Sequence, residues 1–423
     1  MRDFCPRHEH LSRRSLIKGS LATAAGGTLM NWGGLFNSDV MAEEVKKRNK
    51  RCILIWLNGG CSQFESFDMK VGRPTGGIFR ETSTNVPGTR ICELMPKIAQ
   101  RMDKLTVIRS MRTSQIDHPG GIYLMHTGWS RAANTQFPEI GAIIAKYCGD
   151  AHSDLPNFVK ISSNGDAGSG FLGPQFQPFK LGRDGELPNF STSPLSETLE
   201  ARRHSLRDFV ESKYAENHHA DPVRMHREAY ERARRLNNVR DTFKLDAEWE
   251  NYREKYGNSK IGRRMMIAAR LVEAGVAFVE VGQSGYDTHA DNFEGHKSLI
   301  PPMEHAWAAL IDDLEERGLF DDTLIVWMGE IGRTPNINNR SGRDHYVRSW
   351  TTALAGGGVK GGLVYGESDE DGRDVKDNKV TEGDFFATVY TALGIDPATE
   401  NYSGVRPIPL AQFDHRVIKD ILV

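Results

Sequence analysis

Carboxylate and imidazole side chains gather in two loops of this 423-residue chain, each placed soon after an apolar run. The loop after VAFVEVG contains Asp287, His289, Asp291 and His296. The loop after TLIVWM contains Glu330, Asp344 and His345. Oxygen and nitrogen ligands of these kinds suit zinc, manganese and similar divalent ions. Two such ions about 4 Å apart would stabilise the attacking and the leaving oxygen of a displacement at phosphorus or sulfur.

Two arginines lie in the second loop, beside these candidate ligands. Arg333 or Arg343 would hold the non-bridging oxygens of a sulfate or phosphate through the paired N–H groups of a guanidinium. A plainer interpretation is also open, in which Glu330 caps a helix or pairs with Arg333, and His345 donates to a backbone carbonyl. The Asp-x-His sequence that begins at Asp287 is also common in turns. The joint position of these groups after apolar runs is what favours a site.

The apolar runs predict buried strands, because continuous runs of this kind are typical of parallel strands covered on both faces. Five strands are predicted at residues 52–57, 104–111, 156–162, 276–282 and 323–328, with two shorter ones within 350–366. Helices are predicted from near Pro301 and over 381–395, where apolar residues recur at helical spacing. Strand, helix and strand in alternation indicate an α/β fold with a mostly parallel central sheet sandwiched by helices.

Two further polar loops follow predicted strands, namely residues 58–68 and the segment around His118. In an open α/β sheet, ligands bind outside the carboxyl ends of the strands. We therefore expect four polar loops to converge at one edge of the sheet.

A highly charged stretch, residues 194–274, has a helical pattern with breaks at HHADPV and YGNSK. We expect this stretch to be an inserted helical region or cap that contributes no strand to the sheet.

The first 42 residues resemble a twin-arginine export signal. Arg13 and Arg14 precede a short stretch rich in Ala and Gly, and VMA at residues 40–42 offers a small-residue cleavage site. The apolar part is too short and too interrupted for a spanning helix of about 20 residues. We expect the mature chain, residues 43–423, to pass the twin-arginine machinery and to be periplasmic or secreted, without a stable membrane span. A disordered basic N-terminus is the alternative.

Composition argues against several classes of function. Lys and Arg total 54 and Asp and Glu total 56, so no strong overall charge favours nucleic acid as a partner. The cysteines beyond the signal are Cys52, Cys61, Cys92 and Cys148. They show no C-x-x-C spacing, which argues against a zinc ribbon or a thioredoxin motif. No G-x-S-x-G follows a strand, which disfavours a Ser-His-Asp hydrolase.

Several segments resemble successive motifs of the bacterial family called domain of unknown function 1501. They are WLNGGCSQFESFDMK, HPGGIYLMHTG, YDTHADNFEGH, DDLEERGLFDDTLIVWMGEIGRTP and GRDHY. The resemblance runs from about residue 50 to the C-terminus. That family is similar to the sulfatase and alkaline phosphatase superfamily. The resemblance implies an alkaline phosphatase-like α/β fold that hydrolyses sulfate or phosphate esters with the help of metal ions.

The resemblance also implies roles for the residues of the earlier loops. An early ligand falls near Glu65 or Asp68. One metal site would draw on Asp287 together with His289 or Asp291.

In the later loop, Glu330 takes the place of the carboxylate that ends a late strand, and His345 that of the last histidine ligand. Arg333 would contact a developing oxyanion. Aligning on HTG puts His118 where sulfatases carry a cysteine or serine nucleophile, so formylglycine chemistry is not expected. His118 would instead be a nucleophile itself, since histidine can form covalent phospho-intermediates, or a ligand at a further metal site.

We therefore expect an exported, metal-dependent hydrolase of a sulfate or phosphate ester, acting on a small molecule or a glycan. Its expected metal ligands are Asp287, His289, Glu330, His345 and Asp68, and its expected catalytic residues are His118 and Arg333. The metal would be zinc, manganese or calcium. The alternative is a non-catalytic periplasmic binding or assembly protein with the same fold. In that protein the site groups would pair with one another, Glu330 with Arg333 and Asp344 with Arg343, and any metal would be structural, with no open coordination position.

Overall fold

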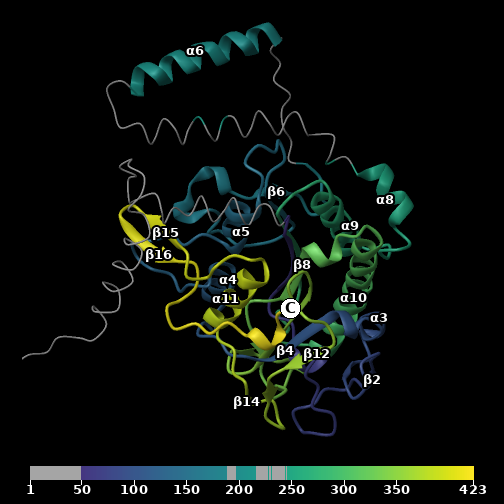
Figure 1. The fold of residues 1–423 in the computed structure, drawn as a ribbon. Coiled ribbons are helices and arrows are strands. Elements are labelled where there is room, and N and C mark those ends of the chain that lie inside the picture. The colour runs from purple at the N-terminus through teal and green to yellow at the C-terminus, as the bar shows by residue number, and fades with distance from the viewer. Residues whose placement is uncertain (1–48, 188–196, 216–226, 228–229, 231–242, 244) are drawn as a thin grey trace, which may run out of the picture. The chain divides into compact units, whose positions relative to one another are not determined.

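The computed structural model describes residues 49–187, 197–215, 227, 230, 243 and 245–423 of the chain (Figure 1). The predicted export signal lies outside the described residues, as does part of the charged stretch 194–274. Among the helices that are described, none combines the length and the apolar character that crossing a membrane requires.

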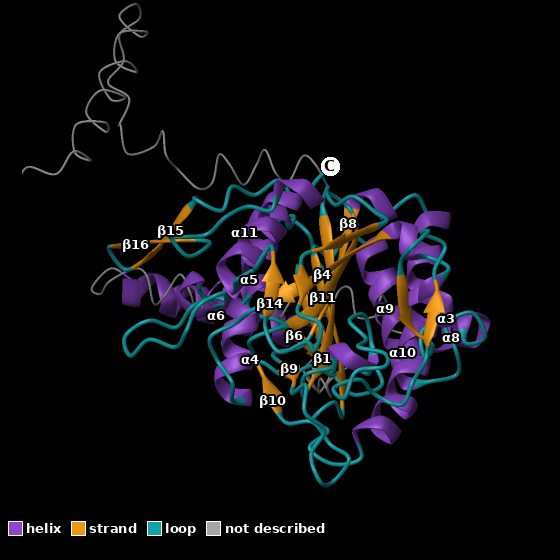
Figure 2. Cartoon of the chain, turned by 90° about the horizontal axis from the view of Figure 1, so that it is seen from below, coloured by secondary structure: helices purple, strands orange, loops and turns teal. Residues whose placement is uncertain are grey.

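An eight-stranded sheet lies at the centre of the fold, in the order β12-β4-β11-β8-β1-β7-β5-β6 (Figure 2). Its strands are β1 Arg51–Asn58, β4 Leu105–Met111, β5 Phe158–Ile161, β6 Phe179–Leu181, β7 Phe278–Ser284, β8 Thr323–Met328, β11 Trp350–Gly356 and β12 Leu363–Tyr365. β11 is antiparallel to both neighbours, and the other neighbouring pairs are parallel. The predicted mostly parallel sheet is confirmed, and the carboxyl ends of its parallel strands meet at one edge.

Helices cover both faces of this sheet (Figure 2). One face carries α4 His118–Thr127, α5 Ile140–Cys148 and α11 Glu382–Ala392. The other carries α3 Pro96–Ala99, α9 Lys260–Glu273 and α10 Asn292–Glu316. The structure also describes α6 Glu197–Ala215 and α8 Asp246–Tyr252. Small antiparallel pairs are β2 Glu81–Ser83 with β3 Arg90–Cys92, β9 Gly332–Arg333 with β10 His345–Tyr346, β13 Glu367–Ser368 with β14 Val375–Asp377, and β15 Glu400–Ser403 with β16 Arg406–Pro409.

β1 lies inside the sheet because its side chains are apolar toward both faces. Alternate residues point to opposite sides of a strand. Those that pack with α9 and α10 are Ile53, Ile55 and Leu57. Those that pack with α5 and α11 are Cys52, Leu54 and Trp56. Two helical layers thus exclude water from a strand whose sequence is an unbroken apolar run.

α9 falls within the stretch that we expected to be an insert, yet it packs on the sheet. Its Ile261, Met265, Ala268 and Val272 recur at helical spacing and belong to the same buried cluster as one face of β1. The charged residues of this helix gave the stretch its polar composition without removing this apolar face. The end of the expected insert is therefore part of the layer that covers the sheet.

α10 begins at Asn292, not near Pro301 as expected, and it contains Pro301 and Pro302 in its interior. Proline inside a helix removes a donor and crowds the preceding turn. Upstream of these prolines, His296 and Ile300 are fully buried. The packing of this face on the sheet outweighs the local preference of proline, as tertiary contacts commonly do for helices.

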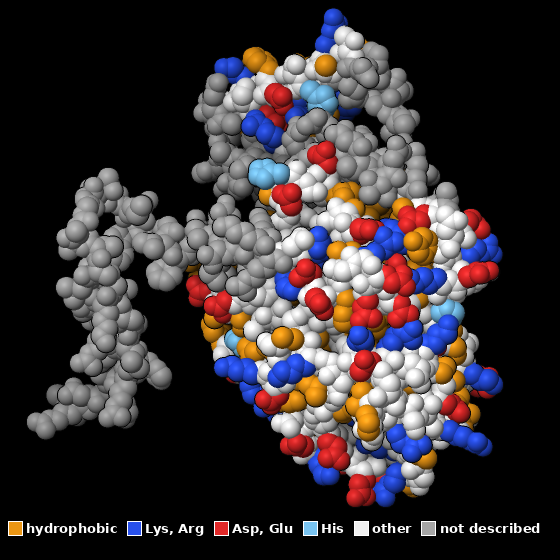
Figure 3. Space-filling model, turned by 45° about the vertical axis from the view of Figure 1, so that its right-hand side comes forward, with side chains coloured by type: hydrophobic (Ala, Val, Ile, Leu, Met, Phe, Trp, Pro, Cys, Tyr) orange, Lys and Arg blue, Asp and Glu red, His pale blue; other side chains and the backbone are white. Residues whose placement is uncertain are grey.

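Charges of both signs lie side by side on the surface. Over the face in Figure 3, Lys and Arg side chains are interspersed with Asp and Glu. Pairs such as Lys376 and Glu367, 3.2 Å apart, are exposed on both sides. This mixture agrees with the nearly balanced composition.

Four ionisable side chains are buried together between the sheet and α4. Lys160 Nζ lies 2.8 Å from Glu139 Oε2 and 3.3 Å from Glu280 Oε2. His126 Nε2 lies 3.0 Å from Glu280 Oε1. All four side chains are at most 1% exposed. Burial alone would raise the pKa of Glu280, but the charges of Lys160 and His126 hold it at about 2. Glu280 is therefore a carboxylate whose charge is balanced inside the protein.

We predict that Glu280→Gln lowers the free energy of unfolding by about 3–5 kcal/mol at pH 7, because it removes the carboxylate that His126 contacts and one of the two that Lys160 contacts. Urea denaturation of the full chain measures this change. The control is Glu367→Gln, which breaks the exposed pair with Lys376 and should cost at most about 1 kcal/mol. Equal losses in the two variants would contradict this account.

The same substitution should also change the pH dependence of stability. A carboxyl group whose pKa is lowered on folding stabilises the protein above its unfolded pKa and stops doing so as the pH falls through its folded pKa. For Glu280 this window runs from about 4.5 down to about 2. The difference in unfolding free energy between wild type and Glu280→Gln should shrink across that window.

Candidate metal site

Three imidazole rings turn their Nε2 atoms toward the carboxylate of Asp287. His118 Nε2 lies 3.2 Å from Asp287 Oδ2. The Nε2 atoms of His289 and His345 lie 3.1 Å and 3.3 Å from Asp287 Oδ1. The structure thus brings four of the predicted site residues together, and possible ligand atoms of His118, Asp287 and His345 lie within 4.8 Å of one another.

These residues come from separate loops at the carboxyl edge of the sheet. His118 is the first residue of α4, which follows β4. Asp287 and His289 lie between β7 and α10. His345 lies on β10, where it stands opposite Arg333 of β9, the short strand that follows β8. Parallel strands therefore deliver side chains from distant parts of the sequence to the same edge.

Two of the three rings each contact a carboxylate of their own through Nδ1. His118 Nδ1 lies 2.8 Å from Glu330 Oε1, and His289 Nδ1 lies 2.5 Å from Asp344 Oδ1. An ionised carboxylate can only accept, so each Nδ1 carries the proton, and a neutral ring then has its lone pair on Nε2. The hydrogen bond to Glu330 raises the pKa of His118, and the hydrogen bond to His289 lowers the pKa of Asp344. Metal-binding histidines in proteins are commonly held in this way.

The Nε2 atoms of two rings also lie close to one another. Those of His289 and His345 lie 3.0 Å apart, and both also face an oxygen of Asp287. His289, whose proton is on Nδ1, directs the lone pair of its Nε2 at both neighbours. Nearby, Glu330 Oε2 is buried and has no hydrogen-bond partner within the residues that the structure describes. A divalent cation would accept these lone pairs, so this set of donors fits a bound metal.

Arg333 is fully buried and contacts Asp287 from the protein side. Its Nη2 donates to Asp287 Oδ1 at 2.8 Å and to the carbonyl of Gly59, and its Nε donates to the carbonyl of Gly60 at 3.0 Å. Burial alone would raise the pKa of Asp287, but the hydrogen bond and charge of Arg333 lower it to about 2. Arg333 thus keeps Asp287 ionised. Its expected contact with a substrate oxygen stays a prediction.

The loop after β1 does not bring a carboxylate to this cluster. Asp68 pairs with Lys70 at 3.0 Å and accepts from the Ser368 hydroxyl. Glu65 is fully buried and pairs with Arg343 at 3.0 Å. The expectation that Asp68 or Glu65 supplies an early ligand is not met, because each carboxylate already has a cation of its own.

Arg343 and His296 also have their hydrogen bonds satisfied inside the protein. Besides its ion pair, Arg343 donates to the carbonyl of Thr334 at 3.0 Å. His296 Nε2 accepts from the backbone N–H of Ser62 at 3.0 Å, and its Nδ1 donates to the carbonyl of Asn292 at 2.9 Å. Both side chains are buried, so they join the loops to one another instead of facing a ligand.

Gly59 belongs to the site, although the sequence analysis did not single it out. Its N–H donates to Glu330 Oε1 at 2.8 Å. Its φ is +107°, and a Cβ there would lie 2.4 Å from the backbone nitrogen of Asp287. The Gly-Gly pair directly after the first apolar run was the available signal. Asp291, by contrast, is an exposed residue that precedes α10 and stays outside the cluster.

The buried group of His126, Glu139 and Glu280 also brings possible ligand atoms together. Here the ammonium of Lys160 contacts both carboxylates. The chain thus supplies its own cation at this point, which leaves the cluster around Asp287 as the better candidate for a metal.

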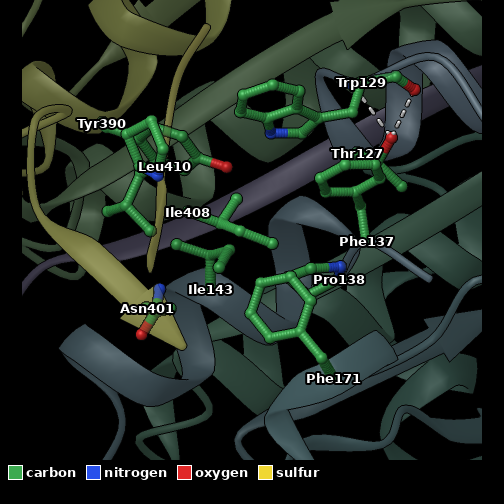
Figure 4. Close-up of a pocket in the computed structure, with 11 residues that line it drawn as sticks. Thr127, Trp129, Phe137, Pro138, Ile143, Phe171, Tyr390, Asn401, Ile408 and Leu410 are labelled. Carbon is green, nitrogen blue, oxygen red and sulfur yellow. Dashed lines mark hydrogen bonds between the residues drawn. The ribbon is translucent and has the colours of Figure 1, made fainter. Parts of the chain in front are cut away.

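A small cavity lies at the other end of α4 (Figure 4). Its lining includes Trp129, Phe137 and Ile408, and its volume is about 10 Å³. That is room for about one water molecule, too little for a substrate. Thr127, the last residue of α4, lines the cavity, and it comes nine positions after His118, which is about 13 Å along the helix. The cavity is therefore separate from the candidate site.

Comparison with known proteins finds a family match over nearly all of the described chain. The family model described as Protein of unknown function (DUF1501) matches residues 49–422. No curated protein matches.

The chain is also similar to several solved structures, each at 11% sequence identity. One is a protein in the alkaline phosphatase superfamily from Vibrio parahaemolyticus, with a TM-score of 0.40 and coverage of 88% of this chain and 79% of that chain. Another is the lipoteichoic acid synthase LtaP from Listeria monocytogenes, with a TM-score of 0.38 and coverage of 88% and 80%. A third is a phosphonate monoester hydrolase from Silicibacter pomeroyi, with a TM-score of 0.38 and coverage of 88% and 76%. Identities this low do not establish a shared activity.

We predict that Gly59→Ala destabilises the protein more than Gly72→Ala does. The φ angles of the two glycines are +107° and +78°, so alanine is strained at both positions. A Cβ at Gly59 would collide with the backbone of Asp287, whereas one at Gly72 meets nothing within 4 Å. We expect a loss of about 1 kcal/mol for Gly72→Ala and about 3 kcal/mol or more for Gly59→Ala, measured by urea denaturation. Equal losses would show that the close approach at Gly59 is unimportant.

Proposed function

Because this chain belongs to the family described as Protein of unknown function (DUF1501), we propose its function from the chemistry of its own site. We propose a metal-dependent hydrolase of a sulfate or phosphate ester that works without formylglycine chemistry. The observation that carries this proposal is the meeting of three imidazole Nε2 atoms at the ionised carboxylate of Asp287.

Four residues would offer ligands to the metal, namely His118, Asp287, His289 and His345, and the possible ligand atoms of His118, Asp287 and His345 lie within 4.8 Å of one another. Three imidazole nitrogens with one carboxylate suit zinc and related transition ions, whereas calcium takes about six to eight oxygen ligands. We therefore propose zinc before manganese, and either of them before calcium. When bound, such an ion polarises the ester and lowers the pKa of a water molecule, which supports hydrolysis at neutral pH.

The carboxylates behind the rings have a positioning role in this proposal. Glu330 and Asp344 fix the tautomers of His118 and His289, so that each ring offers the lone pair of Nε2. Glu330, expected from the sequence as a ligand, uses Oε1 for the ring and for the N–H of Gly59. Through Oε1, Glu330 therefore positions His118, and its Oε2, which has no hydrogen-bond partner among the described residues, is left as a ligand atom for the metal.

His118 was expected to be a nucleophile or a ligand, and the geometry favours the ligand. Its Nε2 faces Asp287, as do those of the other two rings, and its Nδ1 is held by Glu330. A histidine in this position leaves the attack on the ester to a water molecule. The buried Arg333 would act by keeping Asp287 ionised.

The alternative is a non-catalytic binding or assembly protein in which particular site groups pair with one another. Its expected pairs were Glu330 with Arg333 and Asp344 with Arg343. Instead, both carboxylates contact imidazole rings, and those rings keep their Nε2 atoms directed at the proposed metal position. This difference favours the hydrolase.

We also propose that the protein is exported by the twin-arginine machinery and acts in the periplasm or outside the cell, on a small-molecule or glycan ester. The support is the sequence of residues 1–42, with Arg13 and Arg14 before a short Ala/Gly-rich stretch.

We predict that the purified full chain holds about one divalent metal ion per molecule, and that His345→Ala lowers this content about tenfold or more. Elemental analysis measures the metal. The metal-loaded protein should hydrolyse 4-nitrophenyl sulfate or 4-nitrophenyl phosphate, and His345→Ala should not. His152→Ala, which removes an exposed histidine outside the site, is the control and should change neither property. If elemental analysis finds no metal in the wild-type protein, the hydrolase proposal is wrong and the binding-protein alternative is supported.

We further predict that Asp344→Asn weakens metal binding by about 10- to 100-fold, because His289 loses the charged acceptor that orients its ring. Competition with a chelating dye measures the affinity. Asp377→Asn, at an exposed position on β14, should leave the affinity unchanged. Unchanged affinity in Asp344→Asn would mean that Asp344 does not support a metal ligand.

A further inference from the structure

A cleft lies at the same edge of the sheet as the histidine cluster. Its lining includes Ser162 directly after β5, Arg183 just after β6 and Ser284 at the end of β7. These strands are neighbours in the sheet, in the order β7-β5-β6. The cleft has a volume of about 560 Å³, which is large enough for a small anionic group and the atoms that carry it.

The cleft carries positive charge without an acid in its wall. Its charged lining residues are Arg183, Lys260 and Arg264, and the described residues that line it include no carboxylate. Arg183 is exposed and has no ion pair within the part of the chain that is described. Lys260 pairs with Asp184 at 3.1 Å, and both partners of that pair are exposed. The hydroxyl groups of four serines complete the polar wall, those of Ser162, Ser259, Ser284 and Ser298.

Arg264 is the buried member of this set, with 8% of its surface exposed. Its Nη1 donates to the carbonyl of Gly282 at 2.8 Å, and its Nε donates to the carbonyl of Arg183 at 2.5 Å. Within the described residues its Nη2 has no hydrogen-bond partner. Burial lowers the pKa of Arg264, and the attraction of nearby Asp184 offsets only part of this effect. A buried guanidinium without a direct carboxylate partner is costly unless an anion completes its contacts.

The N-terminus of α9 adds to the positive potential of the cleft. Lys260 is the first residue of this helix, and both it and the capping residue Ser259 line the cleft. The Ser259 side chain accepts from the N–H of Gly262, which leaves other first-turn N–H groups without a helical partner. Such helix ends favour bound anions.

The cleft and the metal position are close enough for one substrate to reach both. Ser284 lines the cleft and Asp287 belongs to the cluster, and three residues of chain span at most about 11 Å. Asn58 also joins the two places, because its Nδ2 donates to Ser284 Oγ at 3.4 Å and the next residue is Gly59 of the site.

We propose that this cleft is a subsite for a second anionic group of the substrate. The substrate would then be a polyanion whose further sulfate or phosphate group lies within about 11 Å of the ester that is cleaved. This inference rests on the proposed hydrolase function and names the class of its substrate. Both groups are tetrahedral oxyanions, which arginine and serine side chains bind through the same hydrogen bonds.

The test uses two pairs of probes with the purified full chain. One pair is hexane-1,6-diyl bisphosphate and hexyl phosphate, and the other is the corresponding bissulfate and monosulfate. Calorimetric titration at about 0.01 M salt, where charges are little screened, gives each affinity. We expect the probe with two anionic groups in at least one pair to bind about tenfold tighter than its single-headed partner. The pair with the larger difference identifies sulfate or phosphate as the preferred group.

Substitutions then locate the second contact. Arg183→Gln should remove most of the affinity advantage of the probe with two anionic groups. Lys260→Gln should also reduce this advantage. Arg406→Gln, an exposed arginine on β16, should leave the advantage intact. The proposal is overturned if wild type shows no advantage for either pair, or if Arg183→Gln keeps it.

The outcomes also separate this inference from the proposed function. If the chain binds no metal and cleaves no ester, yet Arg183→Gln still weakens binding of the probe with two anionic groups, the proposed hydrolase function is wrong and the anion subsite stands. If esters are cleaved with metal and Arg183→Gln binds both probes as wild type does, the hydrolase stands and the subsite is wrong.

Discussion

The carboxylate of Asp287 is the interaction on which the site depends, because three imidazole nitrogens and one guanidinium face it at once. Arg333 keeps it ionised from the buried side, so the rings meet a fixed negative charge. Other residues hold these closely spaced side chains in position. Carboxylates behind two rings set their tautomers, and Gly59 lets the backbone after β1 approach closely enough to hold both Glu330 and Arg333. The positions of these loops are therefore adapted to one small centre of charge.

Most strands of the central sheet could be predicted from local runs of apolar residues in the sequence. The five main predicted strands correspond to β1, β4, β5, β7 and β8 within about two residues at each end. They were predictable because a strand covered by helices on both faces is an unbroken apolar run. The loops that follow them could also be placed, since parallel strands end at one edge. That is why Asp287, His289 and His345 were expected to meet.

Pairings across long stretches of sequence were not predictable. Glu330 lies 212 residues from His118, and no spacing rule joins them. Asp68 looked as suitable a ligand as Asp287, but Lys70 and Ser368 hold it elsewhere. The start of α10 was missed because its prolines are unfavourable locally and only packing on the sheet compensates for them. Local sequence thus identified which groups are available, while tertiary contacts decided which of them meet.

The position of β1 has a consequence for how the chain is made. β1 comes early in the sequence but lies in the middle of the sheet, and its last residue, Asn58, contacts Ser284, 226 residues later. Its other neighbour, β8, comes later still. During synthesis this apolar strand leaves the ribosome with both edges unpaired, and it stays so until most of the chain has followed. Such contacts at long range slow folding, and unpaired strand edges aggregate. Assembly of the sheet is therefore a late event in folding, because both edges of β1 stay exposed until β7 and β8 have been synthesised.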